Sequence, residues 1–252
     1  MNTLKTGQNK NIAAERKFND LLALKYFDIW DTYPIQLFTT QVESNFLADM
    51  IPDNSSVLLL GSGGGRELPI LLRKGCEITA VDISPGMLEI GKKRYPQAAI
   101  EWVEADLHWL PKDLQKFDSA VCLGAVFNYL RDPILFFQNL KSALKPTASL
   151  ILSVINAEHP SEKKKHTTLS DGRIRTLYNL SDIQQNLSQC GFEIITNYGI
   201  RFFADLVPSE WNRENSEHLK LLQELLELEK KWINVLPARA GKFLFIEAKV
   251  TD

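Results

Sequence analysis

The apolar residues of this chain gather in short runs, and segments with helical spacing separate them. The runs predict five strands, near 57–60, 77–81, 100–103, 118–123 and 148–154. Helical spacing appears between and after them, near 65–74, 86–94, 133–144 and 181–190. Continuously apolar strands that alternate with helices are typical of a parallel sheet covered on both faces, so the pattern predicts an α/β fold.

The first fifty residues depart from this rhythm. Residues 1 to about 16 are polar, and we expect them to be frayed. Residues 18–50 have a helical pattern that Pro34 interrupts, which predicts two helices with a break between them. We therefore expect residues 1–50 to form an N-terminal helical cap on the sheet.

The C-terminal part departs from the rhythm as well. Two apolar runs, near 192–198 and 242–250, predict two more strands. A leucine-rich amphipathic segment lies between them, so we expect a helical insert over 200–240. With no second block of alternating strands and helices, residues 1–252 are treated as a single domain.

A glycine-rich loop follows the first predicted strand and runs into a helix. Glycine allows a tight turn, and its missing Cβ lets a ligand approach the backbone, so a strand, glycine loop and helix form a cradle for a nucleotide cofactor. The next strand ends in Asp82, a carboxylate suited to a ribose diol. Dinucleotide sites favour G-x-G-x-x-G. Here the glycines are spaced G-x-G-x-G, at Gly61, Gly63 and Gly65, and Arg66 takes the place of the last dinucleotide glycine.

Together with Asp82, this loop resembles that of the class I S-adenosyl-L-methionine-dependent methyltransferases. The similarity covers roughly residues 45–250 and includes Val81–Leu88, Glu104–Leu107 and Phe117–Ala125. It implies a Rossmann-like, seven-stranded sheet in the order 3-2-1-4-5-7-6, with the last strand antiparallel. It also implies S-adenosyl-L-methionine as cofactor and methyl transfer as the activity.

The resemblance further implies roles for individual residues. Asp82 would hold both ribose hydroxyls, Ile83 would pack on the adenine face, and Asp106 with the Leu107 N–H would bind the adenine edge. The glycines would admit the methionine arm, and Leu123 would line its side. The implied cofactor-binding set is Gly61, Gly63, Gly65, Asp82, Ile83, Asp106, Leu107 and Leu123.

One position departs from the family pattern. Leu59 stands where these enzymes commonly have an acid that helps to hold the methionine ammonium. A charge-assisted hydrogen bond contributes about 1.5–3 kcal/mol, so its loss would weaken cofactor binding. The Gly61 carbonyl, Asp28 or Asp31 could take over this contact. Leu59 is also the main support for a catalytically silent scaffold or partner subunit as an alternative function.

Catalytic residues are harder to predict, because a sulfonium methyl group needs little beyond an aligned nucleophile, exclusion of water and sometimes a base. The candidates near the expected reaction face are His108, Asn128 and Tyr33, with Tyr129 beside them. His108 is the best titrating group, since an imidazole changes charge near neutral pH. A surface histidine and a helix-capping asparagine are the alternative interpretations.

Composition narrows the function further. The net charge is −2 and the sequence pI is about 6.1, so no broad basic surface for nucleic acid is expected. The exit of the fourth strand, Leu123–Gly124–Ala125, lacks the Asp/Asn-Pro-Pro-aromatic motif of enzymes that methylate base amino groups. A small organic acceptor, methylated on O, N or C, is therefore the expected substrate. A nicotinamide-dependent oxidoreductase stays as an alternative.

The remaining expectations concern location and partners. Three widely spaced cysteines favour a reducing cytoplasm, and four unclustered histidines give no reason to expect a metal. No apolar run in the sequence is long enough for a membrane helix, so we expect no membrane partner. The sequence leaves a homodimer as one possible oligomeric state.

Large apolar side chains lie outside the predicted sheet. These side chains either pack the domain or form a lid over the acceptor. They are Tyr26, Phe27, Trp30, Tyr33, Phe202, Phe203 and Trp211.

Overall fold

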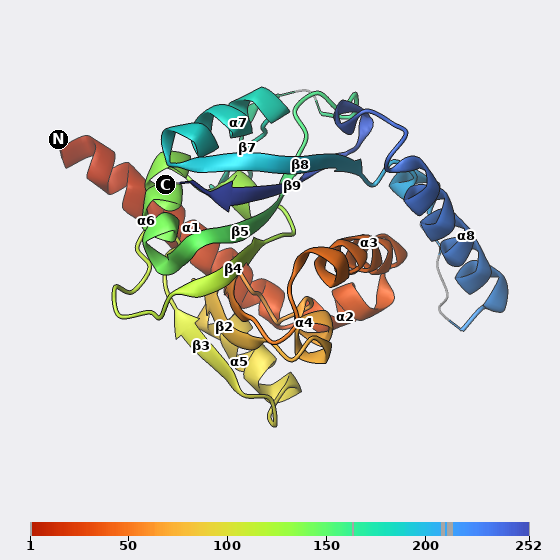
Figure 1. The fold of residues 1–252 in the computed structure, drawn as a ribbon, viewed down its shortest axis with the longest axis horizontal. Coiled ribbons are helices and arrows are strands. Elements are labelled where there is room, and N and C mark those ends of the chain that lie inside the picture. Colours follow the sequence, from red (N-terminus) through yellow and green to blue (C-terminus); the bar gives the residue numbers. More distant parts are fainter. Residues whose placement is uncertain (1, 163, 208–209, 211–213, 252) are drawn as a thin grey trace.

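A seven-stranded sheet forms the centre of the molecule, in the order β3-β2-β1-β4-β5-β9-β8 (Figure 1). The computed structural model describes residues 2–162, 164–207, 210 and 214–251, with side chains from residue 12 onward. The strands are β1 (Ser56–Leu60), β2 (Glu77–Asp82), β3 (Ile100–Glu104), β4 (Phe117–Cys122), β5 (Leu144–Ile155), β8 (Phe192–Ile200) and β9 (Phe243–Val250). The first five are parallel, and β9 runs antiparallel between β5 and β8. This confirms the predicted strand order.

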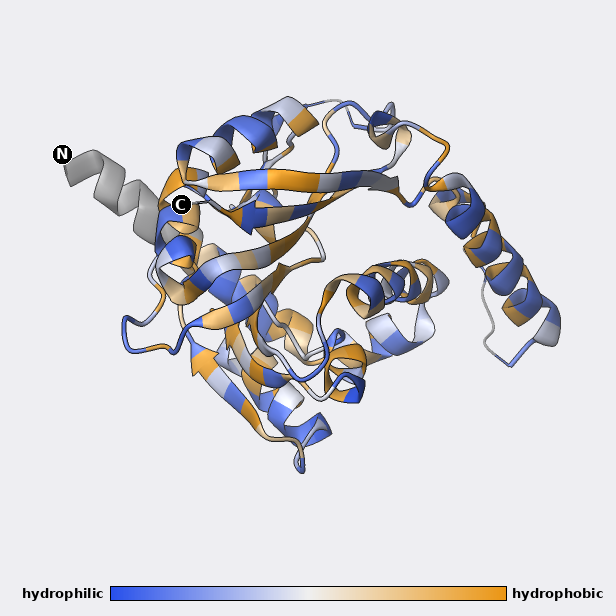
Figure 2. Cartoon of the chain, in the orientation of Figure 1, coloured by the Kyte–Doolittle hydropathy of each residue, from blue (hydrophilic) through white to orange (hydrophobic). Residues whose placement is uncertain are grey.

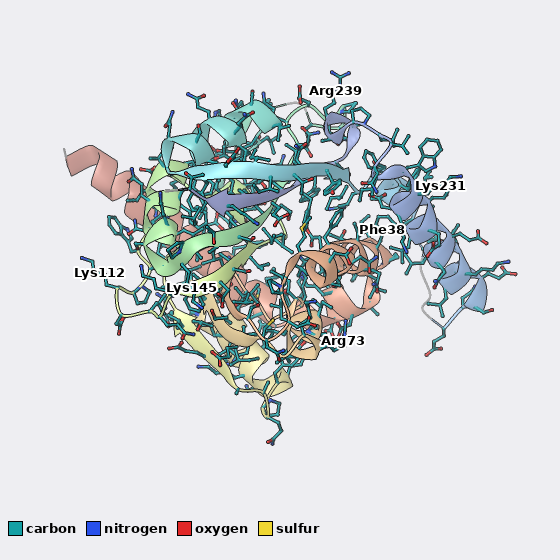
Figure 3. The ribbon with its side chains drawn as sticks, in the orientation of Figure 1. Phe38, Arg73, Lys112, Lys145, Lys231 and Arg239 are labelled. Carbon is teal, nitrogen blue, oxygen red and sulfur yellow. The ribbon has the colours of Figure 1, made fainter. Side chains whose placement is uncertain are left out.

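Helices cover both faces of the sheet because its central strands are apolar on both sides. All five residues of β1 are buried. Leu58 and Leu60 pack in one apolar cluster, with α6 (Pro133–Ala143) and α7 (Leu180–Gln189). Leu59 packs in the other, with α4 (Leu68–Arg73) and α3 (Pro34–Met50), whose Phe38 is fully buried (Figure 3).

The N-terminal helices differ from the prediction. The helix α1 spans Asn2–Ala23, so the expectation of a frayed segment over residues 1 to 16 is wrong. Contacts with another helix hold α1 in place, and such contacts cannot be recognised from the sequence of this segment alone. Asp20 accepts hydrogen bonds from the Ser84 hydroxyl at 2.5 Å and the Gly86 N–H at 3.1 Å. Both residues lie at the start of α5 (Pro85–Arg94), on which α1 therefore docks.

The predicted break at Pro34 is present, but three helices occupy this region instead of two. After α1 the chain forms α2 (Tyr26–Thr32), and Pro34 then opens α3. Proline fits the first turn of a helix, where its missing N–H would have no partner in any case. The cap over the sheet is thus α1, α2 and α3.

The insert between the last two strands holds α8 (Ser216–Trp232), which extends away from the sheet and contacts α3 (Figure 1). Apolar and polar residues alternate along α8 (Figure 2). Its Glu229 accepts backbone N–H bonds from Phe202 at 3.2 Å and Phe203 at 3.3 Å, which fixes α8 to the end of β8. Short 3₁₀ turns complete the segment at η2 (Ala204–Leu206) and η3 (Ala238–Ala240).

A two-stranded hairpin, β6 (His166–Thr168) and β7 (Ile174–Thr176), was not predicted. It lies beside η1 (Val126–Tyr129), the 3₁₀ turn that follows β4. None of the helices in the described part of the chain combines the length and the apolar character that crossing a bilayer needs.

Phe245 on β9 is a test of how strongly the antiparallel strand is anchored. Its side chain is fully buried and its ring lies 4.5 Å from that of Phe46 on α3. We expect Phe245→Ala to lower the free energy of unfolding by about 3–5 kcal/mol, measured by urea denaturation. Ile195→Ala on the neighbouring strand is the control, since Ile195 is 52% exposed. Equal losses in the two variants would contradict the placement of β9 in the core.

Candidate active site

A cavity of about 330 Å³ lies at the carboxyl ends of β1, β2 and β4. Strand order reverses between β1 and β4, and open α/β sheets bind ligands at such a switch point. The glycine loop, the segments after β2, β3 and β4, and the helices α1 and α2 all contribute to its wall. A residue of the β6–β7 turn, Arg173, closes one end.

The glycine loop forms the floor of the cavity. Gly61, Gly63 and Gly65 all have positive φ angles, of 64°, 52° and 85°, which side chains other than glycine rarely adopt. Gly61 and Gly63 line the cavity, and a Cβ added at Gly63 would lie 2.9 Å from the Tyr26 hydroxyl. Gly65 lies outside the lining and is needed for the turn, where a Cβ would clash with Leu68.

Asp82 projects from the end of β2 into this floor. Its two carboxylate oxygens accept the Gly63 N–H at 2.8 Å and the Ser84 N–H at 2.9 Å, so the side chain is held in one orientation. Burial raises the pKa of Asp82 to about 6, against the opposing effect of these hydrogen bonds. Ile83 follows in the cavity wall, as predicted from its position.

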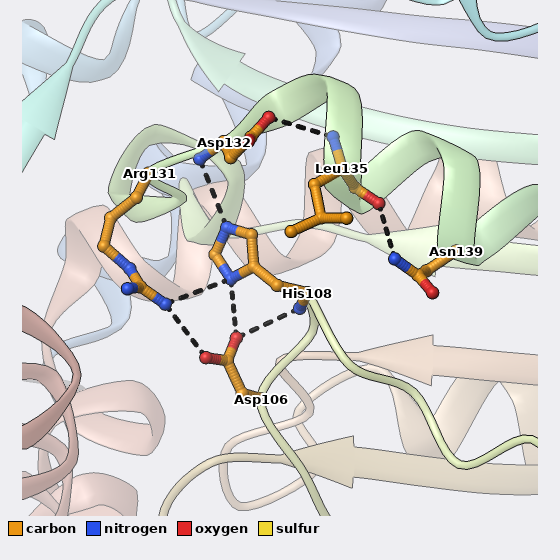
Figure 4. Close-up of polar contacts among 6 residues, drawn as sticks. All are labelled: Asp106, His108, Arg131, Asp132, Leu135 and Asn139. Carbon is orange, nitrogen blue, oxygen red and sulfur yellow. Dashed lines mark hydrogen bonds and ion pairs between the residues drawn. The ribbon is translucent and has the colours of Figure 1, made fainter. Parts of the chain in front are cut away.

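Asp106 belongs to a hydrogen-bonded cluster after β3 (Figure 4). One carboxylate oxygen accepts from His108 Nδ1 at 2.6 Å and from the His108 backbone N–H at 3.0 Å. The other pairs with Arg131 at 3.0 Å. Burial alone would raise the pKa of Asp106, but the His108 hydrogen bonds and the Arg131 charge outweigh it and hold the pKa below its usual value. Asp106 and Leu107 both line the cavity.

His108 is buried and both of its ring nitrogens have partners. Nε2 accepts the Asp132 N–H at 3.2 Å, which makes it the unprotonated nitrogen and assigns the proton to Nδ1, facing Asp106. An imidazole held this way has no nitrogen left to take a proton from a substrate. His108 lines the cavity and uses both ring nitrogens to orient Asp106 and the start of α6, while its catalytic role stays a prediction.

Asn128 and Tyr33 are not among the described residues that line the cavity, so their catalytic roles stay predictions without support from its geometry. Asn128 is fully buried, donates to the Thr176 carbonyl at 2.7 Å and accepts the Ile155 N–H at 2.9 Å, so it ties η1 to β5 and β7. Tyr33 is 56% exposed at the junction of α2 and α3. Leu123 and Tyr129, in contrast, line the cavity.

A buried charged pair that sequence analysis missed lies beside the glycine loop. Leu59 packs in the apolar core, and Arg66 and Glu67 line the cavity beside the glycine loop. The Arg66 guanidinium lies 2.8 Å from Glu67 and 2.5 Å from Glu43 of α3. Burial, opposed by Arg66, raises the pKa of Glu67.

The proposed substitutes Asp28 and Asp31 are not at the cavity. Asp28 is exposed, and Asp31 is half-buried and pairs with Arg94 at 2.6 Å. The Gly61 carbonyl stays a candidate, since Gly61 lines the cavity. The sequence did carry one sign of the Arg66–Glu67 pair. Arg66 directly follows the glycine loop, at the position where a dinucleotide site would have its last glycine.

Of the two segments that we expected to form a lid, only the N-terminal helices lie at the cavity. Four large side chains of the N-terminal helices line the cavity, Phe18, Leu22, Tyr26 and Trp30. No described residue of the 200–240 insert does so, and Trp211 lies outside the described residues. The insert packs against α3 through α8 and η2 instead, so its predicted role as a lid is wrong for the residues that can be placed.

Parts of the chain that contain this site are similar in sequence to known methyltransferases. Residues 58–152 match the methyltransferase domain family. The chain is 28% identical over 156 residues to ubiquinone biosynthesis O-methyltransferase of Coxiella burnetii, covering 60% of this chain and 66% of that protein, just under two thirds of its length. It is 24% identical over 259 residues to tRNA 5-carboxymethoxyuridine methyltransferase of Escherichia coli, covering 93% and 96%.

Solved structures share the fold. A putative methyltransferase in complex with the Haloferax volcanii Trm112 activator has a TM-score of 0.68 at 19% identity, covering 93% of this chain and 98% of that chain. The Burkholderia thailandensis 1,6-didemethyltoxoflavin-N1-methyltransferase, solved with S-adenosylhomocysteine, has a TM-score of 0.62 at 17% identity, covering 95% and 88%. Residues 58–152 are thus similar to the methyltransferase domain family, and the chain has the fold of solved S-adenosylmethionine-dependent methyltransferases. These similarities argue against the nicotinamide-dependent oxidoreductase that the sequence left open.

The residues of this methyltransferase fit its cofactor. Asp82 keeps lone pairs beyond the two N–H bonds it accepts, so it can take ribose hydroxyls. Gly63 lines the cavity with a φ of 52°, and the Tyr26 hydroxyl packs where a Cβ would stand, so this close packing requires glycine. At the same floor, Arg66 and Glu67 present opposite charges, which suit the carboxylate and ammonium of an amino acid.

The raised pKa of Asp82 predicts how cofactor binding depends on pH. The carboxylate accepts hydroxyl protons when ionised, which it is above about pH 6. We expect S-adenosylhomocysteine affinity, measured by calorimetry, to fall as the pH drops from 7 to 5. At pH 8, Asp82→Asn should weaken S-adenosylhomocysteine binding by about 1.5–3 kcal/mol. The variant should also lose most of the fall in affinity between pH 7 and pH 5. A variant with the same affinity and the same pH profile as the wild type would refute the assignment.

Proposed function

We propose that this protein transfers a methyl group from S-adenosylmethionine to a small organic acceptor, on O, N or C, that binds beneath α1. One observation carries the proposal. One cavity is lined both by residues matched to cofactor binding, Asp82 and Leu107, and by Phe18, Tyr129 and Arg173, which lie together. Both groups of residues border one space, which is what transfer between two bound molecules requires.

The cofactor supplies an electrophilic methyl group on a positively charged sulfur. The chain's own contribution is to bind, orient and exclude water. Asp82 is assigned to the ribose, Asp106 and the Leu107 N–H to the adenine, and Glu67 with Arg66 to the amino-acid end. The aromatic side chains of α1 and α2 cover the cavity, which supports exclusion of water from the reacting groups.

The acceptor end combines flat apolar surface with charge. The Arg173 guanidinium lies 3.3 Å from the centre of the Phe18 ring and 5.0 Å from that of Tyr129. Pockets for small ligands are mostly apolar and aromatic with a few placed polar groups, and this end has that composition. The relatedness to an O-methyltransferase of ubiquinone biosynthesis also supports a small acceptor.

A nucleic-acid acceptor is the second candidate, and one observation favours it. The match to the tRNA 5-carboxymethoxyuridine methyltransferase extends over 93% of this chain and 96% of that enzyme. The net charge of −2 counts against it, because RNA binding draws on basic surface. We therefore rank the small acceptor first and include RNA in the test.

The test is an acceptor screen that measures release of S-adenosylhomocysteine. It compares small phenols, amines and carboxylic acids with unmodified and carboxymethoxyuridine-containing tRNA, each at low and high salt. We expect turnover with a small acceptor and little dependence on salt. Methylation of tRNA alone would overturn the small-acceptor proposal. Tight S-adenosylhomocysteine binding without turnover on any acceptor would favour the silent scaffold.

The role of Glu67 can be separated from the rest of the cofactor site. S-adenosylhomocysteine carries an amino-acid end, and 5′-methylthioadenosine lacks it. We expect Glu67→Gln to weaken S-adenosylhomocysteine binding by about 1.5–3 kcal/mol and to leave methylthioadenosine affinity unchanged. Glu89→Gln on α5 is the control, since Glu89 is exposed and its ion pair is with Lys93, on the same helix. Equal losses for the two nucleosides in Glu67→Gln would contradict the assignment.

A further inference from the structure

Glu15 on α1 has a feature that the cofactor site does not explain. Its side chain is 14% exposed and lines the cavity. Its Oε1 atom is buried and has no hydrogen-bond partner among the described residues. A buried carboxylate oxygen without a donor is costly, so native proteins rarely keep one without a use. Glu15 lies in the segment that we expected to be frayed, so it was not among the predicted site residues.

The neighbouring charges leave Oε1 available. The nearest cation is Arg173 of the β6–β7 turn, whose Nη1 lies 3.9 Å from the other oxygen, Oε2. The Nε of Arg173 is already bonded to Asp171 at 2.9 Å. Arg131, after η1, also acts electrostatically on Glu15, but it pairs with Asp106. Glu15 in turn acts on Tyr129 of η1.

The net effect of this environment is a carboxyl group that titrates near neutrality. Burial raises the pKa of Glu15, and Arg173 lowers it; Asp171 raises it again and Arg131 lowers it, which together bring it to about 7. A general base works best when its pKa lies near the pH of the reaction. Glu15 therefore meets the energetic requirement as well as the geometric one.

The other acidic groups in the cavity wall are committed. Asp82 accepts two backbone N–H groups, Asp106 holds His108 and Arg131, and Glu67 pairs with Arg66. Of the described carboxylates that line the cavity, Glu15 is the one with a buried oxygen that lacks a donor. His108 has no free ring nitrogen.

We propose that Glu15 is the general base of the reaction and that the acceptor presents a neutral O–H or N–H group, such as a phenol, to its Oε1 atom. This inference rests on the proposed methyl transfer. The acceptor's oxygen or nitrogen forms a bond to the methyl carbon as the carbon–sulfur bond breaks. The proton of the acceptor passes to Oε1, and the electron pair of the broken bond stays on sulfur, which leaves S-adenosylhomocysteine.

The choice of acceptor class follows from the same charge. A phenol or neutral amine donates a hydrogen bond to Oε1 and needs a base as its nucleophilicity develops. A carboxylic acid would arrive ionised near neutral pH, would need no base, and would be repelled by the Glu15 carboxylate. The proposal therefore selects phenols and amines over carboxylates in the acceptor screen.

The first experiment needs no acceptor. Glu15→Gln removes the charge and keeps the shape, and melting temperature and S-adenosylhomocysteine affinity are measured between pH 5 and 8.5. A carboxyl whose folded-state pKa is raised loses stability as the pH rises from its unfolded value toward 7. The variant should therefore gain melting temperature over the wild type across this interval, with unchanged ligand affinity. A variant that melts lower at every pH, or binds the ligand tenfold more weakly, would overturn the proposal.

The second experiment measures turnover with the phenol or amine that gives the highest rate in the screen. Wild-type kcat should rise through about pH 7 and level off, as Glu15 ionises. Glu15→Gln should lose about 10²–10⁴-fold in kcat and lose this rise, whereas Glu89→Gln should match the wild type. Wild-type rates in Glu15→Gln would refute the base while leaving methyl transfer intact. An inactive wild type would count against the proposed function instead.

Discussion

The buried guanidinium of Arg66 is the interaction on which the site depends. A cation without water must be matched by nearby acceptors, and Arg66 is matched by Glu43 of α3 and by Glu67 of its own loop. Trp30 of α2 lies over it, at 4.6 Å from the ring centre. One charge therefore joins the glycine loop to two helices of the N-terminal cap.

This network extends into the sheet through the hydroxyl of Ser153. The Ser153 hydroxyl on β5 donates to Glu43 at 2.9 Å and accepts the Gly124 N–H, after β4, at 3.0 Å. The loops that form the cavity floor and its far wall are thus tied to one buried cluster. Removing either glutamate would leave the guanidinium undercompensated, which costs more than the ion pair contributes to stability. The same cluster offers a charged pair to the cavity where the family pattern has a strand carboxylate.

The sequence predicted those parts of the structure that depend on local patterns. Apolar runs located the strands, and the glycine spacing with Asp82 located the cofactor floor, because strand burial and positive φ angles restrict residue type at single positions. The resemblance then supplied the strand order. None of these features required knowledge of a partner far along the chain.

The misses share a physical cause, which is contact between distant segments. The first helix is polar and is held by Asp20 on the start of α5, so no periodicity revealed it. Asn128 and His108 have residue types found at active sites, yet their polar atoms are used by backbone and carboxylate partners. The raised pKa of Glu15 comes first from burial, which depends on segments far along the chain such as the turn that carries Arg173.

The central claim is that one cavity beneath α1 and α2 holds the cofactor, with its amino-acid end at the Arg66–Glu67 pair. The most direct test is a crystal structure of the full chain with S-adenosylhomocysteine. The account predicts the ribose hydroxyls on Asp82 and the homocysteine ammonium within hydrogen-bond distance of the Glu67 carboxylate. A ligand whose amino-acid end points away from Glu67 and Arg66, or one bound outside this cavity, would contradict it.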